Sequence, residues 1–298
     1  MINKLPSVSI IFPNFNGGKE PLICLASVQK LNYPQKKLEI IVVDNASSDK
    51  SDQKIKARFP LAKLVKLDKN YGFAKAVNIG IRKANGEFIF VANDDLIFEK
   101  NSLLRLVEFI LKDPKIGVLG GKIYLKSSPK KITSCGYMLN KLTGNVYKSP
   151  FPNKITSPDW VQGCAMLIPK KVFKKIGLFD SGFKHLFEDV DFCFRAKRFG
   201  LKVLYLPEAI FWHGESVSAD KNLSLKYFNW YMGKLRFLFK HMPIINVLSI
   251  LFIQIFIIMP YRSLILRDNR GIPFLKALIY TATKLPKIIQ QRQDASYI

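Results

Sequence analysis

The sequence EIIVVDNASSD at residues 39–49 decides the fold, because a buried apolar run is followed directly by a polar turn rich in helix N-cap residues. The same unit recurs on both sides of it. Residues 8–14 read VSIIFPN and residues 88–95 read FIFVANDD, so each apolar run again ends in polar residues. Helical patterns over 20–31 and 73–84 lie between these runs. Strands alternating with helices predict βαβ units and an α/β fold with a mostly parallel, Rossmann-like sheet flanked by helices.

Polar and acidic side chains stand where these predicted strands end. A further strand is predicted over 62–67, and each of the four strands is followed by a loop that carries one of these side chains. They are Asn14, Asp44, Asn70 and Asp95. In open parallel sheets, ligands bind beyond the carboxyl ends of the strands. Because a stable core requires nothing polar there, the convergence of four loops predicts a ligand site at this edge.

Two acidic clusters suggest chemistry. The turn at 93–95, Asn-Asp-Asp, is typical of a metal–phosphate site, because a divalent cation prefers carboxylate oxygens and shares its remaining positions with a diphosphate. Glu188 and Asp189 begin an amphipathic helix that closes at Gly200. A carboxylate there can be a general base, although acids in a first turn also suit the helix dipole. His213 follows a further strand, and a lone histidine is usually a packed or surface residue unless a metal site is nearby.

Together these segments resemble the family 2 nucleotide-sugar glycosyltransferases, which have the GT-A fold. The resemblance covers about residues 5–240 and rests on six motifs in the family's order, completed by Pro207 and His213. The motifs are VSIIFPNFNG at 8–17, IVVDNASSD at 41–49, NYGFA at 70–74 with NIG at 78–80, FVANDD at 90–95, WVQGCAM with GLFD at 160–166 and 177–180, and EDVDFCFR at 188–195. The most similar branch contains rhamnosyltransferases and related enzymes of cell-surface polysaccharide assembly.

The resemblance implies roles on the donor side. Asp44 would recognise the pyrimidine base of the donor nucleotide, helped by the backbone around Pro13 and Asn14. Asp95 would hold Mn²⁺ or Mg²⁺ on the diphosphate, and His213 would complete the metal shell. The first position of the family's DXD motif is Asn93 in this sequence, which leaves Asp95 as the chief acidic ligand. The other donor-binding positions are Asn70, Gly72, Asn78, Asn93 and Asp94.

The resemblance also implies an acceptor side. Asp189, with Glu188 beside it, would deprotonate the acceptor hydroxyl, and the acceptor would be lined by Trp160, Gly163 and Cys164. One base and no evident nucleophile predict single displacement with inversion at the anomeric carbon. Thymidine- and uridine-diphosphate sugars both fit, because both bases present the same imide edge to Asp44. The expected acceptor is a saccharide hydroxyl, lipid-linked or on an oligosaccharide.

The C-terminal part differs in character. The chain carries 47 Lys and Arg against 22 Asp and Glu, a net charge of +25 that indicates an anionic partner. Residues 242–261 carry no charge and could just cross a bilayer, but basic residues flank them at both ends. A single crossing would put the basic tail outside, against the positive-inside bias. We therefore expect helices lying in the interface of an anionic membrane rather than one transmembrane span, with a buried core helix or a dimer contact as the alternative.

These interpretations divide the chain into a catalytic domain over 1–240, with a nucleotide-sugar half over 1–100 and an acceptor half over 101–240, and a membrane-associated helical tail over 241–298. The first residues show no signal peptide, so we expect the site at the cytoplasmic face of the cell membrane. An inactive, basic, membrane-peripheral module that binds nucleotide sugars is the main alternative. Nucleic-acid binding has little support, because no basic stripe with interleaved aromatics occurs. An oligomer is possible.

Overall fold

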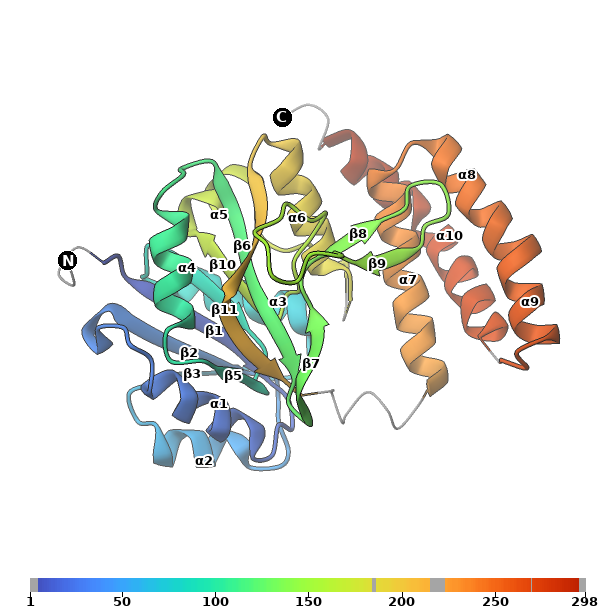
Figure 1. The fold of residues 1–298 in the computed structure, drawn as a ribbon. Coiled ribbons are helices and arrows are strands. Elements are labelled where there is room, and N and C mark those ends of the chain that lie inside the picture. Colours follow the sequence, from blue (N-terminus) through green and yellow to red (C-terminus); the bar gives the residue numbers. More distant parts are fainter. Residues whose placement is uncertain (1–4, 184–185, 215–222, 269, 295–298) are drawn as a thin grey trace.

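The fold is built around one mixed sheet with helices on both faces (Figure 1). The computed structural model describes residues 5–183, 186–214, 223–268 and 270–294. Within them the sheet has nine strands in the order β3-β2-β1-β4-β10-β6-β11-β5, with β7 paired to β6 at the side. The strands are β1 (Val8–Asn14), β2 (Leu38–Asp44), β3 (Lys63–Lys66), β4 (Phe88–Ala92), β5 (Leu96–Phe98), β6 (Ile116–Leu125), β7 (Ser128–Ser134), β10 (Ala165–Pro169) and β11 (Lys202–His213).

The first half of the sheet confirms the predicted βαβ units. Strands β1 to β4 pair in parallel, and their apolar residues alternate between the two faces. Ile11 and Val43 pack with α3, whereas Phe12 and Val42 belong to the core on the other face, with α1 and α4. The helices of this catalytic part are α1 (Glu20–Gln29), α2 (Ser51–Arg58), α3 (Phe73–Lys83), α4 (Ser102–Ile110), α5 (Lys170–Ile176) and α6 (Glu188–Arg198), with a short 3₁₀ turn η2 (Gln35–Lys37).

The second half of the sheet departs from the simple βαβ pattern in two ways. In the apolar run at 160–169 only the residues from Ala165 form a strand, the antiparallel β10, which joins β4 to β6. The strand that starts at Lys202 continues past Pro207 to His213 as β11, because a register shift between Leu206 and Ile210 accommodates Pro207, which has no amide hydrogen to donate. The continuation lets β11 pair with β5, a strand of three residues that the sequence pattern does not indicate. A small hairpin, β8 (Tyr137–Leu139) with β9 (Val146–Lys148), lies outside the main sheet.

The C-terminal helices pack against the rest of the chain through α7 (Leu223–His241) and through the first turns of the next helix, where Asn246 and Ser249 donate to the carbonyls of Lys141 and Leu142. A continuous apolar helix follows, made of α8 (Ile244–Ile253), a π-helical turn η3 (Gln254–Ile258) and α9 (Met259–Leu264). The chain then returns as α10 (Gly271–Asp294), which lies beside α7 (Figure 1). The predicted domain boundary at residue 240 therefore lies in the last turn of α7.

Two buried carboxylates of the catalytic part bind that last turn. Asp191 Oδ1 lies 2.6 Å from Lys240 Nζ and 2.8 Å from His241 Nε2, and its Oδ2 lies 2.9 Å from Arg195 Nε. Asp180 Oδ2 lies 2.8 Å from Lys240 Nζ. Burial alone raises the pKa of Asp191, but the charge of Arg195, the hydrogen bond with His241 and the charge of Lys240 together hold it far below its usual range. The network fastens α7 to α6.

We predict that Asp191→Asn lowers the free energy of unfolding by about 3–5 kcal/mol at pH 7, because it leaves buried cations without their counter-charge. A carboxylate whose pKa is lowered by folding stabilises the protein above its unfolded pKa of about 3.9 and loses that contribution as the pH falls below it. The gap between variant and wild type should therefore shrink below pH 4 in thermal unfolding followed in detergent. Asp113→Asn, which breaks an exposed pair with Lys202, is the control. Equal losses for both variants would contradict the proposed anchoring.

Candidate active site

The ends of β1 and β2 hold the first part of the site. Asn14 and Asp44 are partners in the parallel register of these strands. The Asn14 amide nitrogen donates to Asp44 Oδ1 at 2.8 Å and lies 3.0 Å and 2.9 Å from the hydroxyls of Ser47 and Ser51. Asn14 Oδ1 is buried and has no hydrogen-bond partner. The structure thus brings Asp44 and Asn14 together as predicted, beside half-buried Pro13, and leaves an acceptor atom that a ligand can use.

Asn45, which the sequence offered only as part of a capping-rich turn, joins the third loop to this edge. Its amide nitrogen donates to Asn70 Oδ1 at 2.9 Å, and its Oδ1 accepts from the Tyr71 backbone amide at 2.9 Å. Asn70 Oδ1 also accepts from the Gly72 amide at 2.8 Å. Gly72 has φ +81°, in the region that favours glycine. Asn70 and Gly72 therefore lie beside the Asp44 loop, as predicted.

Asn78 does not reach that edge through its side chain. Its amide nitrogen donates to the Phe179 carbonyl at 2.7 Å, and its Oδ1 accepts from the Phe179 amide at 3.0 Å. Asn78 is buried on α3, and both ends of its amide serve to hold the loop before α6. The contacts of Asn78 are thus those of a positioning residue rather than of a donor ligand.

The acidic turn after β4 lies against the end of β11. Because His213 pairs with Leu96 across β11 and β5, its ring faces the turn. His213 Nε2 lies 2.9 Å from Asn93 Nδ2 and 3.1 Å from Asp95 Oδ1, and this buried oxygen has no partner with hydrogen-bond geometry. A carboxylate oxygen and an imidazole nitrogen that converge in this way fit a divalent cation such as Mn²⁺. No cluster of three or more His, Cys, Asp or Glu side chains with metal-ligand geometry occurs among the described residues, so a bound ion would need further oxygens from the donor.

Asp94 faces the loop after β1. Burial, and then the charge of Asp95, raise the pKa of Asp94 to about 7. A Cβ atom on Gly17 would lie 2.7 Å from Asp94 Oδ2 and 2.6 Å from Asn14 Oδ1, so only glycine fits between them. An ion pair of Lys126 with Glu20, which the sequence analysis missed, lies near the same turn. The Lys126 amide donates to the His213 carbonyl at 2.9 Å.

The second acidic cluster opens α6. Asp189 Oδ2 accepts from the Gly163 amide at 2.8 Å, and burial raises the pKa of Asp189. Glu188 is buried, its Oε2 has no hydrogen-bond partner, and burial together with the charge of Asp189 raises its pKa to about 8. Phe187, the residue before the pair, has φ +73°, a strained conformation for a bulky side chain. Carboxylates with raised pKa values are suited to accept a proton near neutral pH.

The segment 163–164 connects the two acidic clusters. The Gly163 amide binds Asp189, and the next carbonyl, that of Cys164, accepts from the Asn93 amide at 3.3 Å. The predicted acceptor-lining side chains are covered, however. Trp160 is 5% exposed and stacks on Tyr137 at a centroid distance of 5.5 Å, and the Cys164 side chain is buried. Of this segment, the backbone at Gly163 rather than the Trp160 ring contacts the acidic pair at the start of α6.

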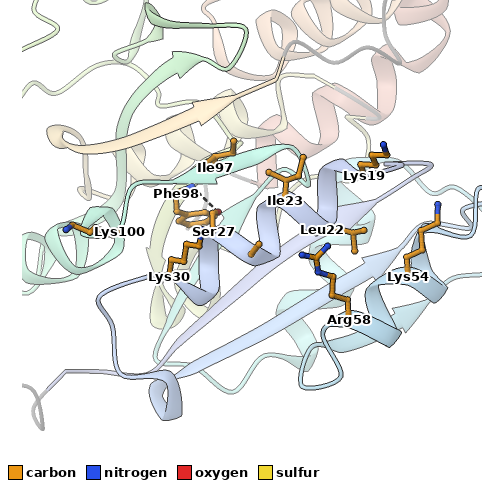
Figure 2. A pocket seen from close by; sticks show the side chains of 11 residues that line it. Lys19, Leu22, Ile23, Ser27, Lys30, Lys54, Arg58, Ile97, Phe98 and Lys100 are labelled. Carbon is orange, nitrogen blue, oxygen red and sulfur yellow. Dashed lines mark hydrogen bonds between the residues drawn. The ribbon is translucent and has the colours of Figure 1, made fainter.

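A cavity of about 810 Å³ lies away from these residues, between α1, α2 and β5 (Figure 2). Its floor is apolar, and the lysine and arginine side chains that frame it are Lys19, Lys30, Lys54, Arg58 and Lys100. None of the predicted site residues lines it. We therefore place the candidate active site at the strand ends and not in this groove.

Comparison with known proteins identifies the family. Residues 9–177 match the family model described as glycosyl transferase family 2. The chain belongs to this family. The site at the strand ends lies where ligands bind in open parallel sheets.

Two named proteins are similar to this chain over most of its length. The chain is 25% identical over 215 residues to the poly-beta-1,6-N-acetyl-D-glucosamine synthase of Staphylococcus epidermidis, covering 70% of this chain and 50% of that protein. It is 26% identical over 220 residues to the probable glycosyltransferase YdaM of Bacillus subtilis, covering 72% and 52%. The chain thus spans about half the length of the curated relatives it matches. Neither relative is named as a rhamnosyltransferase.

The fold is also confirmed. The crystal structure of GalNAc-T7 with UDP, GalNAc and Mn²⁺ superposes with a TM-score of 0.65 at 19% sequence identity, covering 88% of this chain and 58% of that one. This likeness confirms the predicted GT-A fold. At this identity the residues that bind UDP or Mn²⁺ in that protein do not transfer to this one.

We predict that Asp95→Asn weakens Mn²⁺ binding at least about tenfold, because it removes the chief anionic ligand of the proposed ion. Binding would be followed by electron paramagnetic resonance of free Mn²⁺, with the nucleoside diphosphate present. Asp113→Asn, remote from the site, is the matched control and should bind like wild type. Wild-type affinity in the Asp95 variant would remove this residue from the metal site.

Proposed function

We propose that this glycosyltransferase is inverting and metal-dependent, and that it moves a sugar from a thymidine- or uridine-diphosphate donor to a hydroxyl of a lipid-linked saccharide in cell-surface polysaccharide assembly. The observation that carries the proposal is the backbone bridge at 163–164, which joins Asp189 to Asn93, the residue whose side chain contacts His213. The polysaccharide named for the Staphylococcus relative supports the acceptor class.

The donor side follows from the edge of the sheet. Asp44 is held by Asn14 and accepts the imide N–H of the pyrimidine, a group common to uracil and thymine. The diphosphate then lies towards Asn93 and Asp95. A bound Mn²⁺ or Mg²⁺ would be held by Asp95 and His213 and would stabilise the negative charge of the departing diphosphate. Gly17 lies between these two parts, where any larger residue would clash with Asn14 and Asp94.

The acceptor side follows from α6. As the acceptor oxygen bonds to the anomeric carbon, its proton passes to an oxygen of Asp189, and the bond from that carbon to the diphosphate breaks. Attack from the face opposite the leaving group inverts the anomeric carbon. The Gly163 amide orients Asp189, and burial raises the pKa of this carboxyl above its usual range.

We predict that Asp189→Asn lowers transfer by about 10²–10⁴-fold, the usual contribution of a general base. An asparagine oxygen can still accept from the Gly163 amide, so donor affinity should hold within about twofold. Release of the nucleoside diphosphate and titration of the donor are the two measurements. Glu188→Gln is the comparison variant and should lose less activity. A product with retained anomeric configuration, or equal loss of turnover and donor binding in Asp189→Asn, would contradict the mechanism.

A catalytically inactive nucleotide-sugar-binding module remains the competing function. It predicts donor binding without nucleoside diphosphate release for the wild type with every acceptor offered. The unpartnered Glu188 oxygen on the acceptor side favours an enzyme, because a module that only binds the nucleotide sugar has no need to keep this buried group unsatisfied.

Membrane association is the second part of the proposal. The helix Ile244–Leu264 has 21 residues, a mean hydropathy of 2.2 and is long and apolar enough to cross a membrane, and only 22% of its apolar window is buried. However, α7 and α10 lie side by side, with Tyr231 and Phe274 at a ring distance of 5.2 Å. The helix Ile244–Leu264 lies between α7 and α10 in the sequence. If it crossed the membrane, it would draw these two lysine-bearing helices into the bilayer. We therefore propose that the helix lies in the interface, at the cytoplasmic face.

We predict that Phe252→Glu with Phe256→Glu releases the protein from lipid vesicles in flotation assays. Both rings are more than half exposed and contact each other at 5.0 Å. Burial of one such side chain contributes about 1.5–3 kcal/mol, so the double variant should bind at least about tenfold more weakly. Leu61→Glu, at a 96% exposed position of the catalytic part, is the control. Unchanged flotation would mean that this face binds something other than lipid.

A further inference from the structure

A second cavity, of about 410 Å³, lies between α7, the apolar helix and the residues that precede α6. Leu186, three residues before Asp189, forms part of its wall, and the Phe187 ring meets Trp230 edge-on at 5.9 Å. The other wall includes Gln254 and Ile258 of the apolar helix. One side of the cavity is thus continuous with the base-bearing segment, and the other belongs to the helix whose outer face is exposed.

Lys234 on α7 is a buried cation that lines this cavity. It is 6% exposed, its nearest described partner is the Trp230 ring at 5.0 Å, and no carboxylate pairs with it among the residues that the structure describes. Burial lowers its pKa to about 8. Lys240, on the same helix and 5% exposed, instead pairs with Asp180 and Asp191. Burying an ammonium group without a counter-charge costs free energy. The burial of Lys234 therefore needs an explanation, whereas that of Lys240 is explained by its two carboxylate partners.

Two arginines add to the positive charge. Arg262 and Arg270 also line the cavity, and both pair with one carboxylate, Asp268, at 2.9 Å and 2.8 Å. Arg270 lies over the Tyr227 ring at 4.3 Å. Lys226 lines the cavity as well, so four cationic side chains surround it, and none of the described residues that line it is acidic. Such a set favours a multiply charged oxyanion such as a phosphate or diphosphate.

We propose that this cavity binds the phosphate or diphosphate group of the lipid that carries the acceptor saccharide, with Lys234 as the counter-charge. The inference rests on the proposed function, because it names the part of the acceptor that this site would take. The lipid chain lies along the exposed face of the apolar helix, and the saccharide extends past Leu186 to Asp189. Lys234 is a binding residue for the acceptor and takes no part in the chemical step.

The test compares two acceptors on the full-length protein in detergent. Both carry the same saccharide, one on an isoprenyl diphosphate and one on an uncharged alkyl chain. Lys234→Met should raise KM for the diphosphate acceptor at least about tenfold and leave KM for the alkyl acceptor and the donor unchanged. Lys234→Arg should keep most of the affinity. Lys276→Met, an exposed lysine of α10 outside the cavity, is the control and should change none of these values.

Direct binding separates this inference from the proposed function. Farnesyl diphosphate should quench Trp230 fluorescence in the wild type and not in Lys234→Met, whose unfolding temperature should stay the same or rise because a buried unpaired charge is removed. If the wild type turns over no donor but still binds the probe in this way, the proposed function fails and the site stands. Equal loss with both acceptors, unchanged KM for the diphosphate acceptor, or equal competition by inorganic pyrophosphate or phosphatidylglycerol vesicles would overturn the inference.

Discussion

The antiparallel pairing of β5 with the end of β11 is the constraint on which the site depends. β5 begins at the residue after Asp95, so its pairing with β11 sets Leu96 opposite His213. That register alone brings an imidazole from a distant part of the chain to the acidic turn. A shift of one residue would turn His213 to the other face of the sheet. The bulge at Pro207 permits the register, because it lets one strand serve both β6 and β5.

The first turn of helix α6 holds carboxylates with opposite roles, one structural and the others candidates for catalysis. Asp191 is surrounded by Arg195, Lys240 and His241 and is held as a permanent anion that joins α7 to the catalytic part. Glu188 is buried and Asp189 is half-buried, and neither has a cationic partner among the described residues. Desolvation therefore raises their pKa values, whereas pairing lowers that of Asp191. The neighbouring cations separate the structural acid from the candidate base.

The local sequence pattern predicts those features of the site that depend on where strands end and helices begin. The positions of Asn14, Asp44, Asn70 and Asp95 follow from alternating strands and helices, so the site edge could be predicted. Asn78 and Trp160 could not be placed, because their partners, Phe179 and Tyr137, come from distant segments without a pattern of their own. The sequence does not mark Asn45 as a site residue, because an asparagine after a strand is also a common N-cap of the next helix. β5, of three residues, is too short for periodicity to reveal.

The net charge of +25 acquires meaning only when each cation is matched with its partner. Arg236 and Lys240 on α7 form ion pairs with Asp180 and Asp191. Their charges are therefore neutralised within the fold and indicate no ligand. Lys234 occupies the same helix at similar burial, and among the residues that the structure describes it meets an aromatic ring and no carboxylate. Since a fold gains nothing from a buried ammonium left alone, the unpaired lysine, rather than the total charge, is the feature that points to an anionic molecule at this place.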